Sequence, residues 1–200
     1  MSAQFHWPAS IAAACLLAAC QASPPTHYFA LTEVTPTTPR ATLAAQIPIR
    51  VERVMIPGEL DRLELVRRST VNQLQIATFD RWAAPLDDMI RRVLADDLAA
   101  RLAPATIASV NEPAAGEPRR HLFVGVHEFS ADEHGTVVLR AAWLLQTPNA
   151  ASARGSEEVA VEAGSSTADA VVAAMSRALA AFADRMAVSF AAHTEEKKSE

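Results

Sequence analysis

The chain has 200 residues, half of them hydrophobic, and a formal net charge of −5. This length suits one domain, and the apolar content is enough for a real core. The negative balance gives no reason to expect a nucleic-acid partner.

The N-terminus reads as an export signal that ends at a cysteine. Residues 9–19 are almost wholly apolar or small, a run shorter than the roughly 20 residues of a transmembrane helix and typical of a signal peptide. Leu17-Ala18-Ala19-Cys20 resembles the bacterial lipobox, in which the cysteine is lipidated and becomes the first mature residue. We therefore predict a lipoprotein signal peptide over 1–19 and lipidation of Cys20. The alternative is a buried alanine-rich helix with an incidental cysteine.

Lipidation at this position has consequences for the mature chain. Cys15 would leave with the signal, so no disulfide framework and no cysteine-based metal site is expected. Gln21 stands where an Asp usually directs inner-membrane retention in proteobacteria, and so favours the periplasmic face of the outer membrane. Residues 20–27 form the predicted lipidated tether. Its seven residues before Tyr28 span at most roughly 25 Å, which keeps the domain close to its membrane.

The first half of the domain is predicted to be rich in strands. Residues 28–31 suggest a short strand, and the Pro- and Thr-rich residues 35–45 suggest a loop. Residues 47–56 alternate between apolar and polar, as expected of a half-buried strand. Residues 63–68 and 73–78 predict a hairpin.

Residues 85–102 carry the clearest helical pattern. Pro85 suits the first helical position, and Asp87 and Asp88 suit the positive end of the helix dipole. Four-residue spacing predicts the ion pairs Asp87–Arg91 and Asp88–Arg92. One apolar stripe is expected to face the core, and it consists of Leu86, Met89, Ile90, Val93, Leu94, Leu98 and Leu102.

The second half repeats the order of strands followed by a helix. Residues 107–110 suggest a short strand, and residues 121–129 and 136–147 flank the turn DEHG in a predicted long hairpin. Residues 157–162 suggest a third strand.

A long alanine-rich helix is predicted from Ser166 to about Ala192, with Ser166 and Asp169 as a capping box. Its stripe is interpreted as core rather than as a lipid groove, and it consists of Val172, Met175, Leu179, Phe182, Met186 and Phe190. Residues 195–200 are expected to be disordered. The whole pattern predicts an α+β domain over 28–194, with a mostly antiparallel or mixed sheet covered on one face by two main helices.

No catalytic, metal-binding or cofactor-binding constellation stands out in the sequence. It has no Gly-rich phosphate loop, no GxSxG and no HExxH. His121 and His127 share a strand face but lie about 20 Å apart at about 3.3 Å per residue, too far to share a metal. The adjacent aspartates Asp87-Asp88 and Asp96-Asp97 diverge by about 100° on a helix and are interpreted as solvated faces. We expect no enzyme activity.

Several motifs between Cys20 and Leu102 resemble the ABC-type transport auxiliary lipoproteins, the PqiC-like family. They are the lipobox, YFAL from Tyr28, IPGELDR at 56–62 and RWAAPLDDMI at 81–90. The resemblance implies an outer-membrane lipoprotein that serves a transporter with an ATPase, a permease and an MCE-type lipid-binding subunit. It further implies a docking or receiving role without hydrolysis. Self-association into a ring is left open.

Two short segments are candidates for partner contact. Arg81-Trp82 precedes the Pro85 helix, and Trp and Arg are enriched in binding hot spots. Leu60-Asp61-Arg62 forms a second candidate. The plain alternative is that Trp82 packs over the helix start and that the charged residues pair locally. Two other classes of function remain open at this stage, namely a stand-alone lipoprotein that stabilises the envelope and a periplasmic lipoprotein enzyme.

Overall fold

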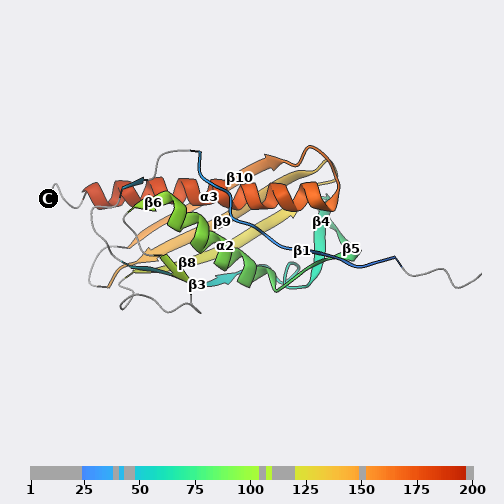
Figure 1. The fold of residues 1–200 in the computed structure, drawn as a ribbon, viewed down its shortest axis with the longest axis horizontal. Coiled ribbons are helices and arrows are strands. Elements are labelled where there is room, and N and C mark those ends of the chain that lie inside the picture. The colour runs from blue at the N-terminus through green and yellow to red at the C-terminus, as the bar shows by residue number, and fades with distance from the viewer. Residues whose placement is uncertain are drawn as a thin grey trace, which may run out of the picture.

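The computed structural model describes residues 24–37, 41–42, 48–103, 107–109, 120–148 and 152–196. Within these ranges two long helices lie side by side on one face of a twisted sheet (Figure 1). The predicted signal peptide, Cys20 and residues 197–200 lie outside the described residues. The expected α+β architecture, with both helices on one face, is confirmed.

Three long antiparallel strands form one side of the main sheet. They are β8 (Arg120–Ala131), β9 (Thr136–Gln146) and, at the edge of the sheet, β10 (Ala153–Glu162). The DEHG turn joins β8 to β9, and its Gly135 has a φ of +88°. A Cβ there would also lie 2.9 Å from the carbonyl oxygen of Ser165, so only glycine fits this turn. The sequence predicted β10 only from residue 157. It begins earlier because it pairs with β9 along its whole length.

The remaining strands of the main sheet make it mixed. β3 (Ile49–Met55) runs parallel to both β8 and β7 (Ile107–Ser109). β4 (Glu64–Thr70) and β5 (Gln73–Trp82) form the expected hairpin, and β4 touches β8 at one residue pair.

Short strands complete the two sheets. β1 (His27–Phe29) runs parallel to the end of β5, which explains why β5 continues past its predicted end at Thr78. A separate two-stranded sheet joins β2 (Ala41–Thr42) to β6 (Leu102–Ala103).

The helix α2 (Leu86–Arg101) follows Pro85 and buries its predicted stripe. All seven stripe residues, from Leu86 to Leu102, are at most 3% exposed. The predicted four-residue ion pairs are wrong. Among the described residues, Asp88 binds Arg91 at 2.8 Å, while Asp87 approaches Arg53 of β3 at 3.6 Å. Packing decides both partners: Arg91 is buried against the core, and α2 lies on β3, which brings Arg53 near Asp87.

The helix α3 (Ala168–Glu196) covers β9 and β10 and packs against α2. Its six predicted stripe residues are buried, with Val172 the most exposed at 6%. The predicted capping box is wrong. The Thr167 hydroxyl accepts the hydrogen bond from the Ala170 N–H at 3.4 Å, so the cap lies one residue later than expected and the helix begins at Ala168 instead of Ser166. The helix also includes Glu195 and Glu196, which were expected to belong to the tail.

An aromatic contact in the core joins α3 to the sheet, and a glycine on β10 leaves room for it. The ring of Trp143 on β9 meets Phe190 edge to face, with centroids 5.1 Å apart. A Cβ at Gly155 on β10 would lie 2.7 Å from the Trp143 ring. The missing side chain at Gly155 therefore lets the indole lie across β10.

Candidate partner-binding site at the 57–63 loop

The 57–63 loop connects β3 to β4 and is a compact turn held by its own backbone. The Leu60 N–H donates to the Pro57 carbonyl at 2.9 Å, and the Arg62 N–H donates to the Leu60 carbonyl at 2.8 Å. The Leu60 side chain is 5% exposed and joins the hydrophobic core. The loop is thus anchored by one apolar side chain in its middle.

Trp82 fixes the far side of the same loop. The backbone N–H of Trp82 donates to the Leu63 carbonyl at 2.6 Å, and the residue is 2% exposed. The following residue, Ala83, donates to the Phe29 carbonyl of β1 at 2.8 Å. The Trp82 backbone therefore holds the end of the loop, while its side chain is buried in the hydrophobic core.

The exposed part of this loop presents a mixed chemistry. Asp61 and Arg62 are exposed, and the adjacent Leu63 is 45% exposed. Arg81 lies at the base, 3.6 Å from Glu64, with both side chains partly exposed. Of the five residues predicted at a partner interface, Leu60 and Trp82 are buried, whereas Asp61, Arg62 and Arg81 are accessible. A rigid loop with opposite charges beside one leucine suits protein recognition.

His121 and His127, the two histidines weighed as metal ligands, lie on β8. His121 is hydrogen-bonded to Glu52 at 2.7 Å, and His127 on the same strand is exposed. Across the described ranges, no group of three or more His, Cys, Asp or Glu side chains is placed to hold a metal ion.

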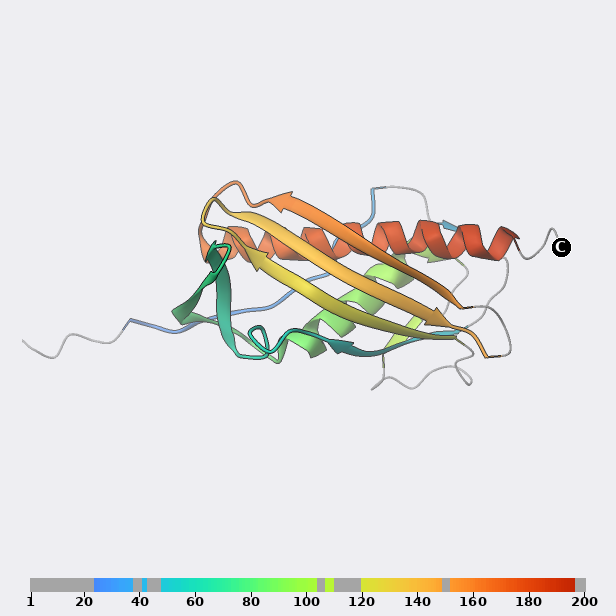
Figure 2. The same cartoon turned by 180° about the vertical axis from the view of Figure 1, so that it is seen from behind.

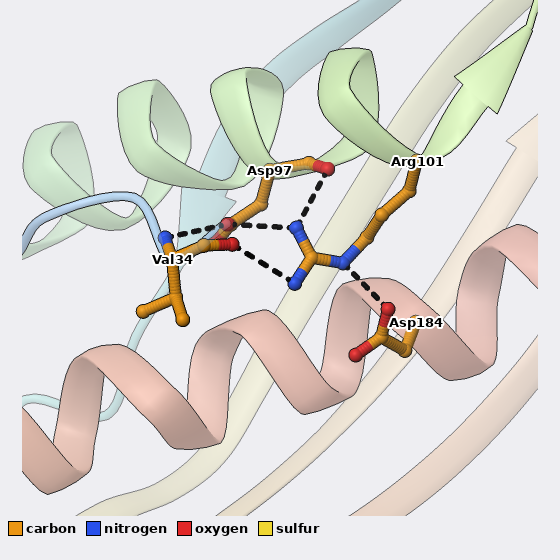
Figure 3. Close-up of polar contacts among 4 residues, drawn as sticks. All are labelled: Val34, Asp97, Arg101 and Asp184. Carbon is orange, nitrogen blue, oxygen red and sulfur yellow. Dashed lines mark hydrogen bonds and ion pairs between the residues drawn. The ribbon is translucent and has the colours of Figure 1, made fainter. Parts of the chain in front are cut away.

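A buried ionic cluster lies between the helices, and sequence reasoning missed it. Asp97 of α2, predicted to be solvated, is fully buried. Its Oδ1 accepts hydrogen bonds from Arg101 Nη1 at 3.0 Å and from the Val34 N–H at 3.1 Å. Arg101 also donates to the Val34 carbonyl and to Asp184 of α3 (Figure 3). The cluster thus fastens residues 30–37 to both helices.

The protonation of Asp97 reflects this burial. Loss of solvent raises the pKa of the Asp97 carboxyl to about 6, although the Val34 N–H and the Arg101 charge oppose the rise. Its second oxygen, Oδ2, is buried without a hydrogen-bond partner. The sequence did hold a signal, because Asp97 lies four residues after Val93 and four before Arg101, next to the apolar stripe.

None of the described helices is long and apolar enough to cross a bilayer. This includes α3, whose length alone would be sufficient.

The sequence of the chain matches a described protein family. The family model described as "ABC-type transport auxiliary lipoprotein component" matches residues 29–187. The chain is 29% identical over 139 residues to the intermembrane transport lipoprotein PqiC of Escherichia coli strain K12, covering 70% of this chain and 73% of that protein. The PqiC of Shigella flexneri matches equally well.

Two crystal structures share the fold at 21% identity. An uncharacterised protein matches with a TM-score of 0.70, covering 82% of this chain and 98% of that one. A protein from Xanthomonas campestris matches with a TM-score of 0.62, covering 88% of this chain and 96% of that one. The family match extends from β1 into α3 and so includes the loop, the sheet and the ionic cluster. The chain therefore belongs to the family of ABC-type transport auxiliary lipoprotein components.

Proposed function

We propose that this chain is an outer-membrane lipoprotein that docks the MCE-domain protein of an ABC-type intermembrane lipid transport system. The family match over residues 29–187 carries this proposal, because it makes the chain an auxiliary transport component. The relatives named intermembrane transport lipoproteins support transport between membranes. The partners are then an MCE-domain protein together with its permease and ATPase. The role is binding and positioning, with no cofactor and no catalytic step.

The proposed anchor is Cys20, and the short distance to the domain supports it. β1 begins at His27, seven residues after Cys20. Residues 1–19 would be the signal, 20–27 the tether and 28–194 the working domain. We expect the wild-type protein to carry acyl mass and to fractionate with the outer membrane. Replacing Cys20→Ser should abolish both, as judged by intact mass and gradient fractionation. A wild-type protein without acyl mass would overturn the anchor.

The proposed dock is the exposed part of the 57–63 loop. Asp61, Arg62 and Leu63 project there, while Leu60 and Trp82 hold the loop in place. Because these supports are buried, the loop needs little ordering when a partner binds, which favours affinity. Arg81 at the base extends the same charged surface.

Co-purification with the MCE-domain protein of the same gene neighbourhood tests the dock. We expect the wild-type protein to retain this partner. Arg62→Glu should weaken the complex by about 2 kcal/mol or more, roughly 30-fold, if Arg62 is a hot spot. Val188→Asp, at an exposed site on α3, serves as a matched surface control. If the wild-type protein retains no MCE-domain protein, the docking function is wrong.

A further inference from the structure

Exposed apolar side chains gather at the end of the molecule where the chain leaves toward Cys20. On the β4–β5 hairpin, Val71 at the turn is 84% exposed, Ile76 is 48% exposed and Phe79 is 37% exposed. Tyr28, on the neighbouring β1, is 65% exposed. An exposed concentration of large apolar side chains usually marks a surface that another phase or molecule covers.

This end of the molecule is also the end nearest the proposed anchor. Figures 1 and 2 show from opposite sides that the hairpin and the N-terminal chain share one end, while the C-terminus lies at the other. Pro24 and Pro25 line a surface hollow of about 350 Å³ together with Phe79 and Gln75 of β5. Pro24 lies four positions after Cys20, a distance of at most roughly 14 Å along the chain. A lipid on Cys20 therefore cannot lie far from the hairpin.

The charge of the hairpin is only weakly positive, because Arg68 is paired with Glu128 and Arg81 with Glu64, while Arg67 donates a hydrogen bond to the Ser166 carbonyl. Residues 64–82 contain three arginines against one Glu and one Asp, a net charge of +1, whereas the whole chain carries −5. Arg67 lines the hollow beside His27. A basic side chain such as Arg67 near an anionic leaflet adds about 1 kcal/mol of attraction, and Tyr favours the membrane–water interface.

We propose that Tyr28 and the β4–β5 hairpin form a membrane-contact surface that seats the domain on the anionic leaflet holding its lipid anchor. This inference rests on the proposed anchoring at Cys20 and extends it. Two attachments fix an orientation that a single lipid anchor cannot fix. The hairpin faces the bilayer, and the end that carries the C-terminus of α3 points away from it.

Site-directed fluorescence on the full lipidated protein tests this orientation. The mature chain has no free thiol once Cys20 is alkylated, so Val71→Cys and Ile76→Cys each introduce one labelling site. Val188→Cys is the control, because Val188 is 67% exposed on α3. Each labelled protein is reconstituted into phosphatidylethanolamine–phosphatidylglycerol vesicles that contain a nitroxide-labelled lipid. Melting temperatures and intact masses are measured first.

We expect the labels at positions 71 and 76 to be quenched by the nitroxide lipid about twofold or more above the label at 188, because they enter the interface. Equal quenching at the three positions, with acyl mass present, would overturn the membrane contact alone. Absence of acyl mass on the wild-type protein would overturn the anchor and this proposal together. No MCE-domain protein is present, so the result is independent of the docking function.

Discussion

Asp97 and Arg101 occupy the boundary between two helices and the N-terminal segment. Arg101 is 4% exposed and interacts with Asp97, Asp184 and the Val34 carbonyl. Burying the charges of Asp97 and Arg101 removes favourable hydration energy, and the hydrogen bonds that these two side chains form offset part of this loss. The cluster therefore holds residues 30–37 against the helices through the backbone of Val34. These residues directly follow β1, the strand nearest the proposed anchor.

Removing Asp97 should destabilise the domain strongly. Asp97→Ala leaves the buried Arg101 guanidinium with one carboxylate fewer and leaves the Val34 N–H without its acceptor. We expect a loss of about 3–5 kcal/mol in the free energy of unfolding, measured by chemical denaturation. Asp184→Ala is the control, because Asp184 is 43% exposed and its pair is screened by water, so a loss of about 1 kcal/mol or less is expected. Equal losses would contradict the buried role of Asp97.

The raised pKa of Asp97 predicts a specific pH dependence. The carboxyl has a pKa near 3.8 when unfolded and about 6 when folded, so the native state holds the proton more tightly. Its contribution to stability is present below the unfolded pKa and is lost as pH rises through about 6. Asp97→Asn removes this titration.

Thermal melting of Asp97→Asn and wild type from pH 4 to pH 7 checks the sign. We expect the melting temperature of the variant, relative to wild type, to increase with pH. Subtracting the wild type cancels the other titrating groups. A relative melting temperature that falls with pH would mean that pairing with Arg101, rather than burial, controls the pKa of Asp97.

At the level of elements, the helices were predictable because their apolar stripes repeat over many turns. The stripes of α2 and α3 were predicted residue by residue, and all of those residues are buried. Local polar contacts were less predictable, because tertiary neighbours decide them. Arg53 of β3 draws Asp87 away from its expected helical partner, and Thr167 replaces Ser166 as the cap.

Strand pairing across the chain could not be read from the sequence. The parallel pairing of β1 with β5 joins residues about 50 positions apart, and no local pattern reveals it. The same pairing continues β5 to Trp82, whose backbone N–H donates to the Leu63 carbonyl at the end of the 57–63 loop. Periodicity thus predicted which faces are buried, while the order of strands depended on the packing of the whole sheet.

The core role of α2 leads to a stability prediction. Leu94 is fully buried in the middle of the stripe. Leu94→Ala should lower the free energy of unfolding by about 2–5 kcal/mol, because apolar contacts are lost and a cavity remains. Arg92→Ala on the exposed face of the same helix should change it by about 0.5 kcal/mol or less. Denaturant titration compares the two variants. An unchanged stability for Leu94→Ala would place the stripe outside the core.

At the scale of the whole molecule, the candidate site was predicted only in part. Sequence alone selected Asp61, Arg62 and Arg81, and these side chains are accessible. It also selected Leu60 and Trp82, whose burial gives them a supporting role, because aromatic and aliphatic residues suit an interface and a core equally well. The exposure of Val71, Ile76 and Phe79 on the hairpin required the fold, because apolar residues in a predicted strand suit a core equally well.

Photo-cross-linking in intact cells tests the central claim most directly. A photoreactive phenylalanine replaces Arg62 on the exposed loop or, as the control, Val188 on α3. We predict an adduct that contains the MCE-domain protein at position 62 and none at position 188. No such adduct at position 62, in cells that express both proteins, would contradict docking through this loop.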